Sequence, residues 1–421
     1  MPALCLLTSL WTGHTLAGAG SGGVNHPRHQ DAPTVVLISI DGFRWDFPER
    51  YPAQSLRRIA AEGAAAERLL PVWPTLTFPY HYTLATGLRP ARHGIVSNDF
   101  PDPDTGRWYR LKDRSAVEDA SFYGGEPVWV TAETQGMVTA SFFWVGSEAP
   151  ISGVRPTHWR RYDKQVPGEE RVGQVLEWLA EPPQTRPHLV TLYFEAVDDH
   201  AHWNGIGSAD FLDAVARVDR WLGLLLDGLF ALPQDVPLYL VLVSDHGQAP
   251  YADLDALVLD RWVDLDGLAL IDGGSYVMAW QERPDPARAE SLADTVNAQW
   301  RHGRAWTRAT APASWELAGN RRFPDLVFQA DPGHAVLSTS ERAGKISAGD
   351  HGWAPDDPAM HGIFMVRGPG IQPGTRLGAV RNVDVAPMIL RLLRLEPPAG
   401  LDGDADTLFR ALFLEQPAAG E

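Results

Sequence analysis

Three apolar runs in this chain are each followed by an acidic residue. The runs and the acids after them are Thr34–Ile40 with Asp41, Leu189–Phe194 with Asp198, and Leu238–Val243 with Asp245. Short apolar runs rich in β-branched residues favour buried strands. The carboxyl ends of parallel strands share one edge of a sheet, so residues far apart in sequence can meet there. The sequence therefore predicts one polar cleft at the edge of a mostly parallel sheet.

Helical patterns alternate with these runs. Apolar residues recur at helical spacing in Gln54–Ala66, Glu169–Ala180 and Ser208–Leu232, and Ser208 is a typical N-cap residue. Alternation of this kind is typical of an α/β domain, with helices flanking a central sheet. We expect one such domain over residues 31–405.

Residues 251–342 break the alternation. The segment has strand-like stretches at Ser275–Trp280 and Asp325–Gln329 and a helical stretch at Pro286–Trp300, but no cluster of ligand-type residues. Beyond it, His351 resumes the polar pattern. We therefore expect a smaller insertion that forms a cap or rim and returns to the main sheet.

The two ends of the chain predict different structures. Residues 1–30 combine a short apolar stretch with small and Gly-rich residues, which is typical of an export signal and a flexible segment. The single cysteine, Cys5, lies there, so a mature chain would have no disulfide. At the other end, Phe364–Val366 and Asp384–Leu395 predict a last strand and helix, and residues 406–421 a mobile tail. We expect a periplasmic or secreted protein with no membrane span.

Charge restricts the class of partner. The 421-residue chain has a formal net charge of -17. Duplex nucleic acid is bound mainly through Lys and Arg that neutralise phosphates, so we do not expect a nucleic-acid partner. Divalent cations bound in an acidic cleft could instead attract an anionic small molecule.

Acidic and imidazole side chains gather after the predicted strands. Asp198 and His202 are spaced i, i+4, which places both on one side of a helix, as zinc ligands often are. Asp41, Asp245 and His246 follow buried strands, where unpaired polar groups cost several kcal/mol. Each Asp could instead cap the next element, so each residue taken singly favours neither a metal-ligand role nor a capping role.

A threonine between two prolines is the candidate nucleophile. Pro74 and Pro79 bracket a turn that contains Thr75 and Thr77. A threonine hydroxyl is a poor nucleophile, but coordination to a divalent metal would stabilise its alkoxide. Chemistry alone allows either threonine, and most loop threonines only bond to nearby backbone.

Five motifs occur in a fixed order along the chain. They are IDGFR from Ile40, TFP from Thr77, YFEAVDDHAH from Tyr193, SDHG from Ser244 and GDHGW from Gly349. Together they resemble the nucleotide pyrophosphatase/phosphodiesterase family of the alkaline phosphatase superfamily, over about residues 35–395. The resemblance implies an alkaline-phosphatase-like α/β fold. It also implies metal-dependent hydrolysis of phosphodiester or pyrophosphate bonds in nucleotides, with release of a nucleoside 5′-monophosphate.

The resemblance implies two Zn²⁺ ions per chain, which act on a small nucleotide or phosphodiester substrate. The first zinc would be held by Asp41, Thr77, Asp245 and His246, and the second by Asp198, His202 and His351. His361 also precedes a glycine, but the spacing in the family favours His351.

The same resemblance implies roles around the substrate. Thr77 would be the nucleophile, because the family's nucleophile directly precedes Phe-Pro, and the reaction would pass through a covalent threonine intermediate. The Asn98 amide and the Thr77 N–H would hold a nonbridging phosphate oxygen. Phe78, Tyr162 and Tyr193 would surround the nucleobase.

Other activities stay open within the superfamily. A phosphomonoesterase, a phosphonate hydrolase or a lipid-headgroup phosphodiesterase can share the metal core. An Asn rather than an Arg near the nucleophile favours a diester, and the modified cysteine of sulfatases has no counterpart. A non-catalytic binding protein is expected to lose a ligand or the threonine. Leu76 and Tyr80 stand where the family often has Lys and Asn, so base and leaving-group preference are open, as is the oligomeric state.

Overall fold

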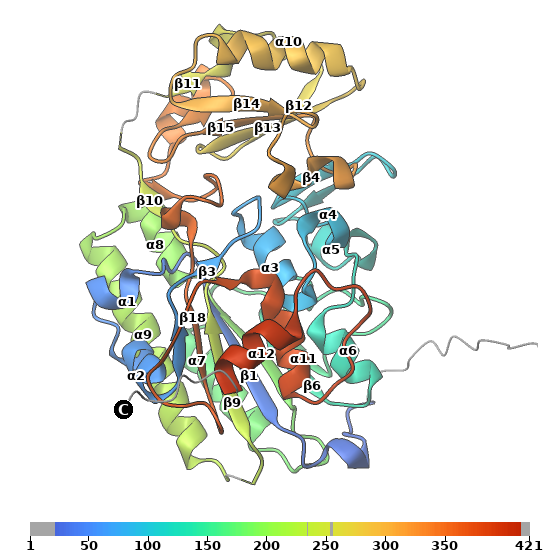
Figure 1. The fold of residues 1–421 in the computed structure, drawn as a ribbon, viewed down its shortest axis with the longest axis vertical. Helices are drawn as coiled ribbons and strands as arrows, with labels where there is room; N and C mark the ends of the chain where they lie inside the picture. Colours follow the sequence, from blue (N-terminus) through green and yellow to red (C-terminus); the bar gives the residue numbers. More distant parts are fainter. Residues whose placement is uncertain (1–21, 234, 253–255, 414–421) are drawn as a thin grey trace, which may run out of the picture.

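An eight-stranded sheet lies at the centre of the computed structural model, which describes residues 22–233, 235–252 and 256–413 (Figure 1). From edge to edge the strands are β19 (Thr375–Leu377), β2 (Ala64–Ala66), β18 (Phe364–Arg367), β9 (Leu238–Val243), β1 (Thr34–Ile40), β8 (Leu189–Phe194), β6 (Thr139–Phe142) and β7 (His158–Arg160). The strands from β9 to β7 are parallel, whereas β18 runs antiparallel to β9. The predicted α/β fold with a mostly parallel sheet is confirmed.

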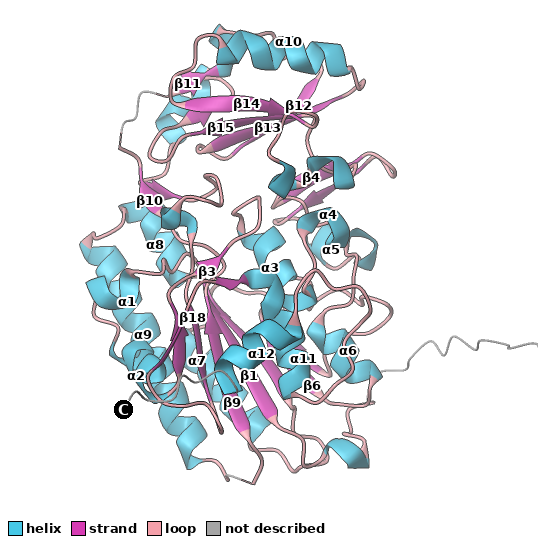
Figure 2. Ribbon diagram, in the orientation of Figure 1, coloured by secondary structure: helices cyan, strands magenta, loops and turns pink. Residues whose placement is uncertain are grey.

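Helices cover both faces of this sheet, as Figure 2 shows. Every residue of β1 is buried, and its side chains alternate between two core clusters, with Val35 and Leu37 in one and Val36 and Ile38 in the other. A strand that is apolar on both faces has to be covered on both. One face packs against α2 (Gln54–Glu62), α7 (Gly168–Leu179) and α9 (Ala209–Ala231), and the other against α3 (Thr77–Thr86), α6 (Val128–Thr134) and α11 (Val385–Leu392).

The predicted helix over Gln54–Ala66 is wrong at its C-terminal end. Helix α2 ends at Glu62, and Ala64–Ala66 is strand β2, which pairs with β18. Gly63 makes the change possible, because a Cβ atom there would lie 2.2 Å from the carbonyl oxygen of Val366. Alanine has a high helix propensity, but here pairing in the sheet decides the structure.

Both predicted flexible ends are partly wrong. Residues 405–413 form α12 (Ala405–Phe413), with Leu408 and Leu412 buried, so residues 406–413 are helical and not the predicted mobile tail. At the other end, the buried Asn25 accepts a hydrogen bond from the Val138 N–H at 2.7 Å. The predicted export signal lies mostly in residues 1–21, and the rest of the predicted tail is 414–421; both ranges are outside the described residues.

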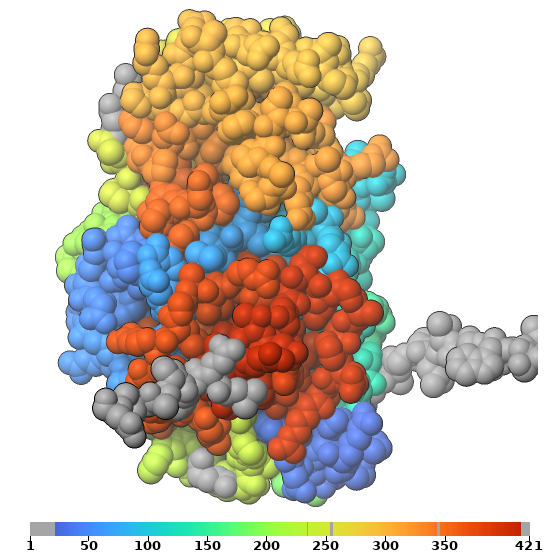
Figure 3. All heavy atoms as spheres, viewed as in Figure 1, coloured from blue at the N-terminus to red at the C-terminus, as the bar shows by residue number. Residues whose placement is uncertain are grey.

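Residues 251–342 form most of a second, smaller unit at the top of Figure 1 and of the space-filling view in Figure 3. Its antiparallel sheet has the order β12 (Leu268–Asp272), β13 (Tyr276–Gln281), β15 (Leu326–Ala330) and β14 (Gly303–Thr307), and it is covered by α10 (Pro286–Asn297). Two short pairs lie at its borders: β10 (Ala249–Pro250) with β17 (Gly349–Asp350), and β11 (Leu257–Val258) with β16 (Val336–Leu337).

Shorter elements complete the described part of the chain. They are α1 (Phe47–Arg50), α4 (Pro90–His93), α5 (Arg114–Val117), α8 (Ala196–Asn204), and the pairs β3 (Leu69–Leu70) with β20 (Val380–Arg381) and β4 (Asp99–Asp102) with β5 (Arg107–Arg110). None of the described helices combines the length and apolar character needed to cross a bilayer.

His93 at the end of α4 gives the fold a testable dependence on pH. Its buried ring accepts the Ile95 N–H at Nδ1 (3.2 Å), and its Nε2 lies 3.0 Å from Thr83 Oγ1, so the neutral form fits. Burial lowers the pKa of His93 to about 3. The unfolded chain therefore binds a proton near pH 6.5 that the native protein does not. The stabilisation is complete above pH 6.5 and is lost as the pH falls toward 3, at about 1.4 kcal/mol per pH unit.

We expect His93→Gln to have a shallower loss of stability below pH 6 than the parent. Urea unfolding of both proteins at pH 7, 6 and 5 measures the difference in slope, and other titrating groups cancel in the comparison. Parallel slopes for the two proteins would contradict a buried neutral His93.

Candidate metal centre and active site

The register of the central strands brings Asp41 beside Asp245. Ser39 of β1 pairs with Val243 of β9, so the residues two positions further along, Asp41 and Asp245, leave the sheet together. Gly42 then turns with φ +65°, and its N–H donates to Asp245 Oδ1 at 3.0 Å. A Cβ atom on Gly42 would lie 1.7 Å from Gln248 Nε2, so only glycine fits there.

Asp41, Asp245 and His246 form one buried group whose ligand-type atoms lie within 4.8 Å of one another. His246 Nε2 is 3.1 Å from Asp245 Oδ2 and 3.5 Å from Asp41 Oδ1. Neither of these buried carboxylate oxygens has a hydrogen-bond partner in the described structure. Orphaned buried oxygens that point at one imidazole nitrogen are what a divalent cation would satisfy.

Asp198, His202 and His351 form a second group of the same kind. Asp198 and His202 lie one turn apart on α8, as their spacing predicts, and His202 Nε2 is 3.4 Å from Asp198 Oδ2. The His351 ring stacks on the ring of His246 with centroids 3.6 Å apart, so the two groups adjoin. The structure thus brings six of the seven predicted metal ligands together here, and the seventh is Thr77.

The charges around the site separate two kinds of carboxylate. Asp41, Asp198 and Asp245 form no ion pair with any described lysine or arginine. The other acids that line the cavity are each paired: Glu148 with Arg114, Glu195 with Arg171, and Asp199 with Lys164. Among the described lining acids, those left without a lysine or arginine partner belong to the two groups.

The pKa shifts at the site reflect the same excess of carboxylates over lysine and arginine side chains. Burial, together with the carboxylates of Asp245 and Asp198, raises the pKa of Asp41 well above its usual value. Burial alone would lower the pKa of His202, but the carboxylates of Asp198 and Asp350 outweigh it and raise that pKa to about 10. The site therefore favours positive charge, which protons or metal ions can supply.

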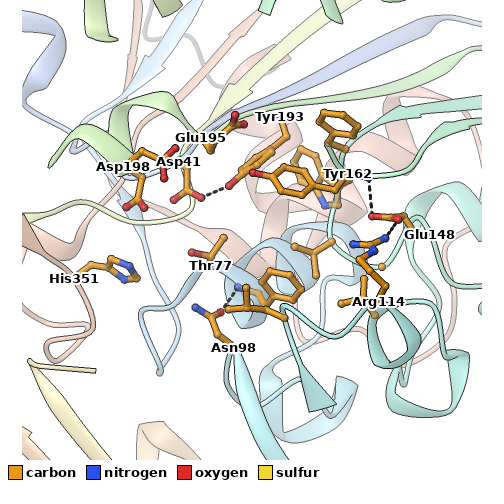
Figure 4. Close-up of a pocket in the computed structure, with 18 of the residues that line it drawn as sticks. Asp41, Thr77, Asn98, Arg114, Glu148, Tyr162, Tyr193, Glu195, Asp198 and His351 are labelled. Carbon is orange, nitrogen blue, oxygen red and sulfur yellow. Dashed lines mark hydrogen bonds and ion pairs between the residues drawn. The ribbon is translucent and has the colours of Figure 1, made fainter. Parts of the chain in front are cut away.

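Thr77 lies at the amino end of α3, beside the first group. Its Oγ1 is 3.5 Å from His246 Nε2. Asn98 accepts the N–H of Phe78 at Oδ1 (2.9 Å), which leaves the amide nitrogen turned away from that bond (Figure 4). The Asn98 amide nitrogen and the Thr77 N–H can donate to an anionic oxygen here.

The two alternatives from the sequence, Thr75 as the nucleophile and His361 as a metal ligand, lie outside these groups. Thr75 is buried and its Oγ1 donates to the carbonyl of Trp353 at 2.7 Å. His361 is also buried, with Nε2 3.0 Å from the carbonyl of Pro355. The geometry thus favours Thr77 and His351 over these rivals.

A cavity of about 300 Å³ opens beside Thr77. Its walls are largely apolar, and Figure 4 shows Tyr162 on the side opposite His351. The apolar lining residues include Phe78, Leu111, Val117, Phe143 and Tyr162. Tyr193 also lines the cavity, but its hydroxyl donates to Asp41 Oδ2, so it also orients that carboxylate. None of the lining residues belongs to 251–342 within the described structure.

Sequence reasoning missed three residues here. His81 lies under Thr77, with Nδ1 2.8 Å from the Thr77 carbonyl and Nε2 2.8 Å from Ser39 Oγ. Arg114 and Glu148 pair at the far end of the cavity. His81 is spaced i, i+4 from Thr77, which could have drawn attention to it, whereas no local pattern marks Arg114 or Glu148.

Curated relatives match most of the length of this chain. Human ectonucleotide pyrophosphatase/phosphodiesterase family member 1 is 32% identical over 380 residues, which is 88% of this chain and 41% of the relative. Venom phosphodiesterase CdcPDE of Crotalus durissus collilineatus is 29% identical over 412 residues, covering 96% of this chain and 50% of that enzyme. The chain thus spans half or less of the length of these curated relatives.

Solved structures and a family model identify the fold and the family of this chain. Murine ectonucleotide pyrophosphatase/phosphodiesterase 5 superposes with a TM-score of 0.83 at 27% identity, covering 90% of this chain and 100% of that one. A model of the type I phosphodiesterase / nucleotide pyrophosphatase family matches residues 35–354. The chain belongs to the type I phosphodiesterase / nucleotide pyrophosphatase family.

Proposed function

We propose that this protein is a metal-dependent hydrolase that cleaves phosphodiester and pyrophosphate bonds in nucleotides and releases a nucleoside 5′-monophosphate. One observation carries the proposal: Thr77 stands between two adjoining groups of ligand-type side chains and an aromatic cavity. The names of the relatives support the substrate class. So does a structure of the murine protein, described as an inactive threonine-to-alanine variant in complex with AMP.

The donor sets support two zinc ions. Carboxylate oxygen and imidazole nitrogen are ligands that zinc accepts in tetrahedral sites. We assign the first ion to Asp41, Thr77, Asp245 and His246, and the second to Asp198, His202 and His351. When bound, the zinc ions would supply charge neutralisation and a lowered pKa for hydroxyl groups at the site.

The chemistry of the chain's own residues then follows in two steps. Thr77 Oγ1 gives its proton to solvent water and attacks phosphorus, and the bond to the leaving oxygen breaks as that oxygen takes up a proton from water. Water next attacks the same phosphorus, the bond to Thr77 breaks, and the threonine hydroxyl is restored. The Asn98 amide and the Thr77 N–H donate to a nonbridging oxygen in both steps. Two in-line displacements give net retention at phosphorus.

The lining of the cavity supports binding of the nucleoside that is released as the monophosphate. Phe78 and Tyr162 offer aromatic faces, on which base stacking contributes about 1–3 kcal/mol with little dependence on the base. The Glu148 carboxylate is 4% exposed at the end of the cavity, paired with Arg114, where the polar edge of a base would lie. An anion and a cation side by side suit an edge that carries both N–H donors and acceptors.

A phosphomonoesterase is the main alternative. A dianionic phosphate needs a strong cation near the nucleophile, and Arg114, the one arginine among the described lining residues, is engaged by Glu148. Asn98 beside Thr77 is neutral. We therefore favour the diester. The names of the relatives, an ectonucleotide enzyme and a venom enzyme, support export of this protein from the cell. We also propose that residues 251–342 form a cap or rim beside the active site.

The substrate class is tested by comparing p-nitrophenyl thymidine monophosphate with p-nitrophenyl phosphate at matched zinc content. We expect kcat/KM to favour the diester by at least about 100-fold, because the described lining residues include no arginine or lysine free to pair with a second phosphate charge. Chelation should abolish turnover and zinc should restore it. Preference for the monoester would reverse the proposal, and the absence of turnover with zinc bound would indicate a binding protein.

Replacement of the nucleophile gives a second test. Thr77→Ala should lose at least about 1000-fold in kcat, because water cannot replace the positioned hydroxyl. Zinc binding by the carboxylates and imidazoles should persist, which metal analysis of the purified variant measures. Thr75→Ser, which keeps the hydroxyl that bonds Trp353, is the matched control and should retain activity. Parental turnover by Thr77→Ala would show that the nucleophile is wrongly assigned.

The far end of the cavity is tested with Glu148→Gln. Loss of a charge-assisted hydrogen bond to the base should cost about 1–3 kcal/mol. We expect KM for a nucleotide diester to rise roughly 5- to 100-fold, while bis(p-nitrophenyl) phosphate, which has no base, is hydrolysed at the parental rate. Equal effects on both substrates would assign Glu148 to structure rather than to base recognition.

A further inference from the structure

Asp350 is a buried carboxylate next to the second group that the proposed reaction does not use. It ends β17 and is 7% exposed. Its Oδ1 accepts the N–H of His351 at 2.9 Å and lies 3.7 Å from Nδ1 of His202. One carboxylate oxygen therefore faces both histidines of the Asp198, His202 and His351 group.

The other oxygen of Asp350 is fixed from outside the group. Asp350 Oδ2 accepts the Tyr251 hydroxyl at 2.6 Å and the Ser347 hydroxyl at 2.8 Å. Tyr251 is the first residue of the 251–342 segment, and its ring packs edge-on against Trp353 at 5.2 Å between centroids. Three donors on two oxygens leave the carboxylate one orientation.

That orientation suits a carboxylate that positions a metal-binding imidazole. His202 has Nε2 toward Asp198 and Nδ1 toward Asp350. A histidine that binds metal through one nitrogen commonly donates the other N–H to a carboxylate or carbonyl, which fixes the tautomer and the ring orientation. The Gly349 carbonyl accepts from His202, and the Asp350 carboxylate, 3.7 Å from Nδ1, adds a negative charge on the same side of the ring.

The 251–342 segment holds the same loop at two more points. Ser275 Oγ donates to the carbonyl of His351 at 2.5 Å, and Gln329 Nε2 donates to the carbonyl of Gly352 at 3.1 Å. Within the described residues, no hydrogen bond or ion pair joins 251–342 to the other group. Toward the first group, the described part of the segment makes only ring contacts near the Thr77 turn, where Trp315 stacks on Trp73 with centroids 4.6 Å apart.

We infer that Asp350 is a positioning residue for the Asp198, His202 and His351 group, and that the 251–342 segment acts on the metal affinity of this group by holding Asp350 through Tyr251. The inference builds on the proposed function, since it takes both groups to bind metal. Residues 251–342 would then influence the affinity for the ion at Asp198, His202 and His351, in addition to any role at the rim of the cavity.

The test is a zinc titration of the metal-free, full-length protein in competition with a chromophoric chelator. Asp350→Asn keeps the shape and an acceptor but removes the charge, and loss of such a partner typically costs 10- to 100-fold in metal affinity. We expect that loss at one of two sites and the parental affinity at the other. Tyr251→Phe should weaken the same site to a smaller extent. Asp199→Asn, which removes an equal charge one residue from Asp198, should change neither site.

A His202→Ala background identifies the site. There, Asp350→Asn should have no further effect on zinc affinity, since the two residues act through one another. Thermal unfolding of the metal-free variants checks that each is folded, and if Asp350→Asn is not, Tyr251→Phe carries the test. Equal loss at both sites, no loss at either, or full additivity with His202→Ala would overturn the inference. Parental protein that binds two zinc ions but leaves nucleotide diesters intact would overturn the proposed function and not this inference.

Discussion

The site depends on three carboxylates that have no lysine or arginine partner among the described residues: Asp41 and Asp245 are buried, and the Asp198 side chain is 15% exposed. Asp41, Asp198 and Asp245 are brought together because strands β1, β8 and β9 end at one edge of the sheet. Buried charges of one sign are costly unless a counter-charge compensates them. Any cation bound there releases that cost, so occupancy of the site and stability of the sheet edge are linked.

The parts of the fold that the sequence predicts are those with strong local periodicity. The long apolar strands and the helices α7 and α9 follow from residue patterns, and the i, i+4 spacing of Asp198 and His202 follows from helix geometry. Short elements depend on distant partners instead. Ala64–Ala66 becomes a strand only because β18 lies beside it, and α12 forms by packing its apolar face on the domain.

The same distinction applies to the site. Motifs of adjacent residues pointed to Asp245 with His246, whose geometry the strand register then explains. Glu148, Arg114 and Tyr251 have no such motif, because each acquires its partner by tertiary packing: Arg114 and Glu148 are 34 positions apart in sequence, and Tyr251 and Asp350 are 99 apart. Contacts of that kind appear only when the chain is folded.

The sharp turn at Gly42 sets the spacing between the two groups by main chain rather than by side chains. Its N–H bonds Asp245 of one group, and its Cα hydrogen faces the space where a Cβ would lie 2.8 Å from Asp198 of the other. Under the proposed assignment of two zinc ions, their separation would be anchored to the end of β1, whose residues are all buried. Exchange of donor side chains would then alter how tightly each ion is held while the span that a phosphate must bridge stays constant.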